Sequence, residues 1–516
     1  MNPIELGIFS SRIESVCDEM GAMLRRAAFS PNIKDRLDFS CAVFDAEGGL
    51  CAQAAHIPVH LGSMAYAMAD IVRGIEWRAG DMIVLNDPYK GGTHLPDITL
   101  VAPVFVQDDL MGFVANRAHH ANVGGSTPGS MPISSRLQDE GILIPPTHIM
   151  RSYRVVDDVM AQLAQGSAQA RGDFSAQVSA NLAGVRRLCQ LIEQFGVDHY
   201  QGFITALNDY GRKLALSSLA ELPDGCYRAV DYLDDDGQGN HDIAIKVAIT
   251  VAAAEDDPDN KSVVVDFTGT ADQVAGNINC PLSVAAAAVF YVFRCLMPSQ
   301  TPACAGTFSV ITVRAPKGCL LNAEYPAAVA AGNVETSTRA VDVVLAALAQ
   351  ALPERVPAAS HGSMNNVAMG AEASPTQPRW DYYETIGGGM GASAGSDGSS
   401  AVQTHMTNTL NTPVESLELH YPLRITAYGV RRGSGGEGAW RGGDGIVREM
   451  AFLAPAQVTL LTERRVHAPW GVGGGQSGAA GINRLNGRVL PGKIQFHAEA
   501  GDCLRIETPG GGGYSS

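Results

Sequence analysis

The chain has 516 residues, with 37 Lys and Arg against 53 Asp and Glu, so its formal net charge at pH 7 is −16. This length corresponds to about three or four domain-sized units. Hydrophobic residues make up 46% and charged residues 17%, a composition that supports a large buried core and argues against a disordered or fibrous protein. A nucleic-acid groove needs a basic field, so the negative charge also argues against nucleic-acid binding.

The cysteines and the apolar segments indicate where such a protein works. The ten cysteines are scattered, with no CxxC pair and no zinc-finger spacing, which is typical of reduced thiols in a cytoplasmic protein. The first residues, Met1 to Glu5, show no basic region followed by an apolar run, so we expect no secretory signal. The longest apolar run, Ser283 to Phe293, is well short of the roughly 20 residues that span a bilayer, so we expect no membrane segment.

The first part of the chain predicts a helix and a hairpin. Asn2, Pro3 and Glu5 form the pattern of a helix N-terminus, and apolar residues then recur at helical spacing over about the first 28 residues. Beyond this helix, β-like runs at 38–45 and 50–54 flank a turn signal.

A second hairpin follows. A strand at 81–86 leads into a loop rich in Gly and Pro, after which runs at 97–106 and 110–117 flank Gln107-Asp108-Asp109.

The rest of the chain alternates between helical and β patterns. The expected elements are two long helices over 176–219 broken near Gly196, a β-rich stretch over 225–316 with strands at 263–267 and 308–313, a helix at 337–352, a Gly- and Ser-rich stretch at 370–400, and short strands with glycine clusters to the end. We expect an α+β fold of multi-layer mixed β-sheets with long helices and a β-rich, glycine-rich C-terminal part. The expected regions are 1–220 with the hairpins and long helices, 221–325 rich in β-structure, 326–405 with a helix and a Gly-rich loop, and 406–516, again rich in β-structure.

The second hairpin brings chemistry-bearing residues together. If it is centred on Asp108, residues whose numbers sum to 216 lie opposite each other, as Asp97 and His119 do. Directly opposed residues share one face of an antiparallel pair, so these two side chains meet while His120 points to the other face. His94 lies three residues before Asp97 in a turn with Pro96, close enough to reach the same point.

Two imidazoles and a carboxylate form a ligand set suited to Zn, Mn or Fe. A fourth ligand could come from the preceding hairpin, where Asp35 and Asp38 lie. A metal with an open coordination position would lower the pKa of a bound water and supply a nucleophile near neutral pH. The alternative is that these are ordinary loop histidines hydrogen-bonded to nearby carboxylates.

Other motifs carry weaker signals. His56 and His60 flank Pro58, which favours an extended loop in which the histidines satisfy backbone groups. The glycine clusters are more typical of tight turns in a β domain than of anion sites, and no G-x-x-x-x-G-K-[ST], G-x-G-x-x-G or G-x-S-x-G pattern occurs in a suitable context. Glu335 precedes a predicted helix and could be an acid or base, or a surface charge beside an N-cap at Thr336 or Ser337.

Many longer motifs, taken together, resemble those of a known family, the B-type subunits of ATP-dependent hydantoinases. This hydantoinase B family also includes the 5-oxoprolinase B-type domain, the lactamase that opens caprolactam, and the metal subunits of acetone and acetophenone carboxylases. The matching stretches cover nearly the whole chain: 30–40, 56–64, 86–89, 91–97, 124–130, 141–146, 333–337, 385–389, 405–409, 441–445 and 509–514.

The resemblance implies a division of labour. In the family a hydantoinase A-type ATPase subunit with an actin-like fold takes up ATP and phosphorylates the carbonyl oxygen of the substrate, and the B-type subunit carries a divalent metal that activates water or holds an enolate. Carried over to this chain, the metal ligands would be His94, Asp97, His119 and Asp38. His120 and Glu335 would then be candidates for proton transfer. The implied protein is one subunit of a cytoplasmic hetero-oligomer that opens a small cyclic amide.

Two positions depart from the family pattern, which has Glu where this chain has Asp35 and Asp where it has Asn122. Asn122 cannot ionise, so it can orient a histidine by a hydrogen bond but cannot abstract a proton. Two other functions stay open. The same metal could stabilise an enolate in a ketone carboxylase, or the chain could be a non-catalytic scaffold for its ATPase partner.

Overall fold

The computed structural model describes residues 2–54, 57–254, 257–373, 375 and 379–515. Its first helix, α1 (Pro3–Ala27), starts where the sequence predicts. The Asn2 side chain accepts a hydrogen bond from the Ile4 amide, and Pro3 takes the first helical position, where its missing N–H would have had no partner in the helix. The buried face of α1 packs on α5 (Ala168–Phe195).

Both predicted hairpins belong to one sheet, whose described strands follow the order β2-β1-β5-β4-β3-β6-β7 and pair antiparallel. β1 pairs with β2 and β4 with β5, as expected, and β3 is the strand expected at 81–86. The two strands that carry the predicted site are therefore central in the sheet. Its strands are β1 (Phe39–Phe44), β2 (Leu50–Gln53), β3 (Met82–Leu85), β4 (Asp97–Val106), β5 (Asp109–His119), β6 (Thr147–Arg151) and β7 (Arg154–Val155).

The register of β4 against β5 decides where the predicted site residues meet. Asp97 pairs with His119, as expected. The turn differs from the prediction, because Gln107 and Asp108 alone form it, so the expected centre at Asp108 is wrong. A β-bulge next to the turn adds one residue to β5 and restores the expected offset before the strands reach the site.

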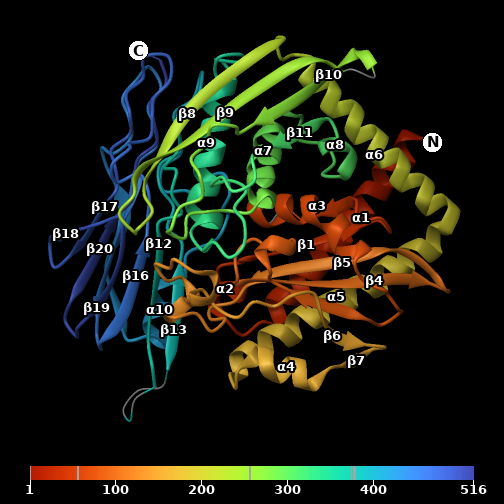
Figure 1. The fold of residues 1–516 in the computed structure, drawn as a ribbon, viewed down its shortest axis with the longest axis horizontal. Helices are drawn as coiled ribbons and strands as arrows, with labels where there is room; N and C mark the ends of the chain where they lie inside the picture. Colours follow the sequence, from red (N-terminus) through yellow and green to blue (C-terminus); the bar gives the residue numbers. More distant parts are fainter. Residues whose placement is uncertain (1, 55–56, 255–256, 374, 376–378, 516) are drawn as a thin grey trace.

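Helices cover both faces of this sheet (Figure 1). On one face lie α1 and α5, and on the other lies α3 (Pro58–Arg73), which also packs on α7 (Leu282–Leu296). Along β4, Ile98 belongs to the apolar cluster on the α1–α5 side and Val101 to the cluster around α3. Since successive strand residues face opposite sides, Asp97 faces α3.

The two long helices expected over 176–219 are α5 and α6 (Val197–Leu219), and they break at Gly196 as predicted. Gly196 has φ 81° and ψ 148°, a conformation that glycine adopts far more easily than any other residue. Helix α5 starts before the expected position, because Ser167 caps it by accepting a hydrogen bond from the Ala170 amide.

The middle of the chain holds a helix that the sequence patterns did not predict. The apolar run from Ser283 to Phe293 folds as α7, which lies beside α9 (Ser337–Leu348) beneath the strands β8 and β9 (Figure 1). Helix α9 starts at Ser337 as predicted and ends before the expected residue 352. The sheet above these helices has the order β11-β10-β9-β8. Its strands are β8 (Gly225–Asp235), β9 (His241–Ala254), β10 (Asp257–Asp266) and β11 (Ile311–Arg314).

One strand boundary in this region was wrong. The strand expected at 308–313 starts at Ile311, because α8 (Ala305–Phe308) takes up the preceding residues. The strand expected at 263–267 is the second half of β10.

The C-terminal part is rich in β-structure, as predicted, and lies on the side of the molecule away from the N-terminus (Figure 1). One described sheet has the order β13-β12-β16-β19 and another the order β14-β15-β20-β17-β18. The strands are β12 (Asn366–Ala371), β13 (Trp380–Glu384), β14 (Leu423–Arg431), β15 (Gly445–Phe452), β16 (Ala456–Leu461), β17 (Ile482–Leu485), β18 (Arg488–Leu490), β19 (Lys493–Ala498) and β20 (Cys503–Glu507).

The glycine clusters of this part allow backbone segments to approach each other closely. A Cβ atom on Gly511 would lie 2.1 Å from the Met390 carbonyl oxygen, so no larger residue fits without a shift of the backbone. The Gly511 amide donates to the Gly443 carbonyl, and the Gly443 amide donates to Met390. The clusters therefore hold loops in contact with one another, rather than only forming turns.

The observed fold class agrees with the α+β prediction. Among the described helices, none has both the length and the apolar character needed to cross a bilayer. All ten cysteines are free thiols. The remaining helices are α2 (Pro31–Lys34), α4 (Asp157–Ala164), α10 (Val414–His420), the short 3₁₀ helices η1 (Pro88–Lys90), η2 (Pro128–Ser130) and η3 (Leu137–Asp139), and the π-helical turn η4 (Gly332–Thr336).

Replacing Gly196 by Ala should destabilise the protein, because a Cβ in this backbone conformation costs about 1–3 kcal/mol. No other atom lies within 4 Å of the added Cβ, so backbone strain is the only cause. Gly7→Ala is the matched control: Gly7 is exposed within α1, also with open space around it, and this change should stabilise the helix by about 0.5–1 kcal/mol. Calorimetric melting temperatures that move down for Gly196→Ala and up for Gly7→Ala would support this view, and equal shifts would contradict it.

Candidate metal centre

The turn before β4 and the end of β5 form part of the wall of a small cavity. The rest of the wall comes from Asp38, the first turn of α3, the turn η4, β13, and loop residues that include Met364, Thr407 and Thr409. The cavity volume is about 20 Å³, enough for one water molecule or one ion. The charged and amide side chains that line it are Asp38, His60, His94, Asp97, His119 and Asn333.

The Asp97 carboxylate is the centre of the cluster and is fully buried. Its Oδ2 accepts hydrogen bonds from Thr93 Oγ1 at 2.6 Å and from Asn333 Nδ2 at 3.1 Å. Its Oδ1 lies 3.1 Å from His94 Nε2 and 3.1 Å from His119 Nδ1. One oxygen is thus anchored by protein donors, and the other faces two imidazoles.

The tautomer of His94 follows from its second contact. Its Nδ1 lies 3.0 Å from the Ala330 carbonyl oxygen, which can only accept, so Nδ1 carries a proton. In a neutral imidazole Nε2 then presents a lone pair to Asp97 Oδ1. Two acceptors this close need a positive charge between them, either a second proton on His94 or a metal ion.

The donor set fits a divalent metal. Ligand atoms of His94, Asp97 and His119 all lie within 4.8 Å of one another, so this group could hold an ion. His94 also shows the outer-shell pattern common in metal sites, in which the ring nitrogen away from the metal donates to a carbonyl. Nitrogen and carboxylate ligands without a thiolate suit Zn, Mn or Fe. The hydrogen-bonded alternative fits the same contacts, because His119 Nδ1 lies at hydrogen-bond distance from Asp97 Oδ1.

Asp38 lies in the same cavity wall but outside this group of three. Its Oδ1 is 3.9 Å from His60 Nε2, and its Oδ2 is 3.7 Å from Arg36 Nη2. The structure therefore brings three of the four predicted ligands together in one group and places the fourth in the wall of the same cavity.

His60 is a site residue that the sequence patterns missed. The expectation of an extended loop around Pro58 is wrong, because Pro58 is the first residue of α3, a position where helices tolerate proline. This start turns His60 toward the cluster, with Nε2 3.2 Å from Asp97 Oδ2. The signal was available as proline followed by apolar residues at helical spacing. His56 lies outside the described residues.

The charges of the cluster depend on burial and on Asp97. Burial alone would raise the pKa of Asp97, but His94 and His60 outweigh it and hold that pKa well below its usual value. For His94, burial lowers the pKa but the Asp97 carboxylate raises it above the ordinary value. For His119 burial prevails and the pKa is lowered. Asp97 is therefore an anion, as a metal ligand must be.

Glu140 supports the cluster from outside the cavity and was also missed. Its carboxylate accepts hydrogen bonds from the Val329 and Ala330 amides and from the Ser134 hydroxyl. These bonds hold the loop whose Ala330 carbonyl orients His94. Burial raises the pKa of Glu140 to about 7. No local pattern could reveal this role, because the contacts join distant parts of the chain.

His120 lies on the opposite face of the sheet, as predicted. Its Nε2 is 2.9 Å from Gln177 Oε1, and its ring lies 4.4 Å from that of Phe174 on α5. Gln177 donates through Nε2 to Ile98 and Asn116, so its Oε1 must accept and His120 Nε2 carries the proton. His120 lines a different cavity, of about 380 Å³.

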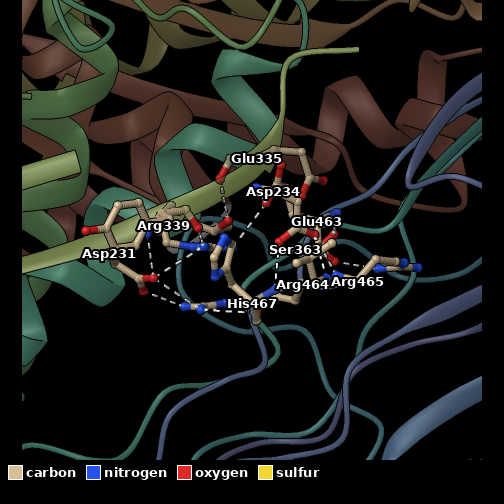
Figure 2. A network of polar contacts seen from close by, with 12 residues as sticks. Asp231, Asp234, Glu335, Arg339, Ser363, Glu463, Arg464, Arg465 and His467 are labelled. Carbon is tan, nitrogen blue, oxygen red and sulfur yellow. Dashed lines mark hydrogen bonds and ion pairs between the residues drawn. The ribbon is translucent and has the colours of Figure 1, made fainter. Parts of the chain in front are cut away.

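Glu335 is fully buried, so the alternative of a surface charge is wrong. It lies in η4 outside the cavity lining, where Oε1 accepts hydrogen bonds from the Met364 amide at 3.0 Å and Asn366 Nδ2 at 2.7 Å. Figure 2 shows it at one side of a network of charged residues that includes Glu463 and Arg339. Burial, with the nearby Glu463, raises the pKa of Glu335 to about 8.

The two departures from the family pattern lie away from the three clustered ligands. Asn122 Nδ2 donates to Asp381 Oδ1 at 2.9 Å, and Asn122 Oδ1 accepts from the Gly124 amide. An aspartate in this position would place a second carboxylate against Asp381. Asp35 is the C-terminal cap of α2 and does not line the cavity.

Comparison with known proteins places this geometry in context. The family model described as Hydantoinase B/oxoprolinase matches residues 2–516. The chain is 39% identical to 5-oxoprolinase 1 of Arabidopsis thaliana, over 99% of this chain and 42% of that protein. It is 40% identical to an uncharacterised protein of Methanocaldococcus jannaschii, over 100% of this chain and 91% of that protein. It is 33% identical to a protein of Pseudomonas sp. that is named as the B-type subunit of a D-/L-hydantoinase, over 100% and 90%.

Two solved structures share the fold. The ATP-dependent caprolactamase from Pseudomonas jessenii superposes with a TM-score of 0.91 at 27% identity, over 100% of this chain and 91% of that chain. An acetone carboxylase chain superposes with a TM-score of 0.88 at 17% identity, over 100% and 76%. The second likeness concerns the fold alone.

Replacing His94 by Ala should abolish stoichiometric binding of a divalent metal, because it removes one of three clustered ligands. His120→Ala is the matched control, since it removes a buried histidine from the other face of the same sheet and should leave the metal content unchanged. Elemental analysis of both purified variants, with circular dichroism to confirm folding, measures the difference. A full metal content in folded His94→Ala would refute this ligand set.

Glu335 should make the protein less stable as the pH rises. Its pKa in the folded protein is about 8, above the ordinary 4.5, so between these values the folded state keeps a proton that the unfolded state releases. This stabilisation is complete at lower pH and is lost as the pH rises toward 8. Glu335→Gln cannot titrate, so its melting temperature should fall less than that of the wild type between about pH 6 and about pH 8.5. Glu354→Gln, at an exposed position, should follow the wild type. Parallel curves for Glu335→Gln and the wild type would contradict the prediction.

Proposed function

The chain belongs to the hydantoinase B/oxoprolinase family, and we propose that it is the metal-bearing subunit of an ATP-dependent enzyme that opens a cyclic amide. The substrate class is a hydantoin, 5-oxoproline or a related lactam. A hydantoinase A-type ATPase subunit would take up ATP and phosphorylate the carbonyl oxygen. The complex would be a cytoplasmic hetero-oligomer.

One observation in this chain carries the proposal. His94 Nε2 and His119 Nδ1 both lie 3.1 Å from Asp97 Oδ1, while Oδ2 accepts hydrogen bonds from Thr93 and Asn333. The group of His94, Asp97 and His119 could hold a divalent ion, and metal-assisted hydrolysis needs a cation beside the reacting carbonyl. The names of the relatives, which include a hydantoinase and 5-oxoprolinases, support the substrate class.

The partner subunit follows from what this chain lacks and what it resembles. The sequence contains no nucleotide-phosphate loop of the Walker type. The chain spans about 42% of the length of the Arabidopsis 5-oxoprolinase, whereas it spans 90% of the Pseudomonas protein that is named as a hydantoinase subunit. The ATPase activity is thus assigned to a second subunit or to the remainder of a longer protein.

The proposed chemistry overcomes amide resonance in two stages. Phosphorylation of the carbonyl oxygen by the partner would make the amide carbon electrophilic. Addition of water and cleavage of the C–N bond would then open the ring to an acyl phosphate, and a second water would hydrolyse that acyl phosphate to the acid and free phosphate. A divalent metal held by His94, Asp97 and His119 would lower the pKa of water and so supply a nucleophile near neutral pH. Thr93 and Asn333 hold the Asp97 carboxylate in place throughout.

His60 and Asp38 are placed to handle the proton that the attacking water loses. Both line the cavity, and His60 Nε2 lies 3.2 Å from Asp97 Oδ2 and 3.9 Å from Asp38 Oδ1. A proton on His60 Nε2 would lie between the carboxylates of Asp97 and Asp38. His120 and Glu335, outside the cavity lining, could take part only through intervening groups.

The size of the cavity sets a condition on the substrate. At about 20 Å³ it accommodates a water or an ion but no cyclic amide. Part of the wall must therefore move before the ring reaches Asp97. Thr407 and Thr409 belong to that wall and lie outside the regular helices and strands, as do Met364 and Thr385.

The same geometry supports a second candidate, a ketone carboxylase in which the metal stabilises an enolate and bicarbonate supplies the new carbon. Its support is the fold shared with acetone carboxylase. A third candidate, a non-catalytic scaffold for the ATPase, requires that the His94–Asp97–His119 group binds no metal.

ADP release by this chain together with an A-type ATPase subunit separates the three candidates. The substrates are 5-oxoproline, a hydantoin, caprolactam and a ketone, each with and without bicarbonate. We expect ADP formation matched by ring-opened acid without bicarbonate, and loss of the ring-opened acid in Asp97→Asn. Strict dependence on a ketone and bicarbonate would show a carboxylase. Ring opening by the partner alone, with no metal bound to this chain, would refute a catalytic role.

A further inference from the structure

The two histidines of the metal centre are held in different ways. His94 is oriented by a hydrogen bond from Nδ1 to the Ala330 carbonyl. His119 contacts Asp97 through Nδ1, and its Nε2 is buried with no hydrogen-bond partner among the described residues. Metal-ligating histidines usually donate their other ring nitrogen to an outer acceptor that fixes the ring. Asp97 holds one edge of the His119 ring, and the groups that pack on its face set the plane of the ring.

Tyr383, on β13, packs on the face of the His119 ring. Its ring stacks on the imidazole of His119 with centroids 4.5 Å apart and planes inclined by 15°. Tyr383 is buried and lines the same cavity. We propose that Tyr383 is the positioning residue for His119, acting through ring stacking. This inference rests on the proposed metal centre and names a determinant of its affinity.

The tyrosine hydroxyl is an anchor and cannot act as an acid toward the cavity. Asn366 Nδ2 donates to Glu335 Oε1 at 2.7 Å and to the Leu461 carbonyl at 3.1 Å, so Asn366 Oδ1 must face the tyrosine. The Tyr383 hydroxyl lies 2.6 Å from that oxygen and donates its proton there. The ring is thereby fixed at its far end.

Arg36 fixes the other end of the same residue. Its Nη1 donates to the Tyr383 carbonyl at 2.8 Å, and its guanidinium carbon lies 5.0 Å from the centroid of the tyrosine ring. Arg36 also lies 3.7 Å from Asp38, so one buried cation connects Tyr383 with the cavity wall.

The Tyr383 hydroxyl is connected, through Asn366 and Glu335, to a buried network of charged residues. Glu335, which holds Asn366, lies in the charged network of Figure 2 beside Glu463. Glu463 pairs with Arg339 at 3.3 Å and also with Lys493, and all of these side chains are fully buried or nearly so. The buried Glu335 assigned to proton transfer from the sequence thus has a structural route to the metal centre, through Asn366 and Tyr383.

Tyr383→Met tests the proposal, because methionine fills much of the same volume without a planar ring. Tyr382→Met is the matched control: Tyr382 is the adjacent buried tyrosine on β13, where its ring packs against Tyr421 instead. The readouts are the dissociation constant for Zn²⁺, measured by competition with a chelating dye, and the visible spectrum of bound Co²⁺, which reports ligand geometry. We expect about tenfold or more weaker binding and a changed spectrum for Tyr383→Met only, the usual effect of losing an outer-shell partner.

Tyr383→Phe keeps the ring and removes only the anchor, so it should retain affinity within a few fold and leave the Co²⁺ spectrum nearly unchanged. If Tyr383→Met does not fold, Tyr383→Phe tests the proposal instead. A loss of Zn²⁺ affinity of tenfold or more in Tyr383→Phe would mean that the site needs the hydroxyl and not the ring plane, and would overturn the proposal. Equal affinities for folded Tyr383→Met and Tyr382→Met would also overturn the proposal. A wild-type chain that binds no Zn²⁺ would overturn the metal centre itself, whereas tight wild-type binding unaffected by Tyr383→Met would refute this inference alone.

Discussion

Burial of the Asp97 carboxylate is the constraint that shapes the site. A carboxylate away from water is costly unless donors and positive charge compensate it. The protein meets this cost asymmetrically: Thr93 and Asn333 donate to Oδ2, while Oδ1 faces His94 and His119. The group of His94, Asp97 and His119 around this carboxylate could hold an ion, so the buried acid marks the position of the candidate metal.

Several elements of the fold hold the residues around Asp97 in place. Arg117, buried on the same face of β5, donates to Thr99 on β4 and to Ser63 on α3, and so ties the helix that carries His60 to the sheet. Glu140 holds the loop that orients His94. Each ligand is therefore supported by an element other than its own, which limits the freedom of the site to relax when a metal binds or leaves.

Some residues of the site could be predicted from the sequence, and others could not. Asp97 and His119 were predictable because antiparallel pairing converts sequence spacing into a cross-strand contact, and the bulge near the turn preserves the assumed offset. His94 followed from its short distance in sequence. Asp38, expected among the ligands, lines the same cavity but lies outside the group of three. His60 was assigned to a loop because proline was taken as a helix breaker and not as a helix start.

Short stretches of sequence were enough to predict the family, the α+β class, the first helix, both hairpins, the break at Gly196 and the His94–Asp97–His119 group. The family follows from motifs spread over nearly the whole chain, whereas the other features depend on local periodicity, on capping residues and on pairing between strands that follow one another in the sequence. Long-range packing, in contrast, brings Asn333, Glu140, Tyr383 and Arg36 to this group, buries Glu335 outside the cavity and turns His120 toward α5. Those contacts join residues far apart in the chain, and the packing of separate layers that creates them has no local signature in the sequence.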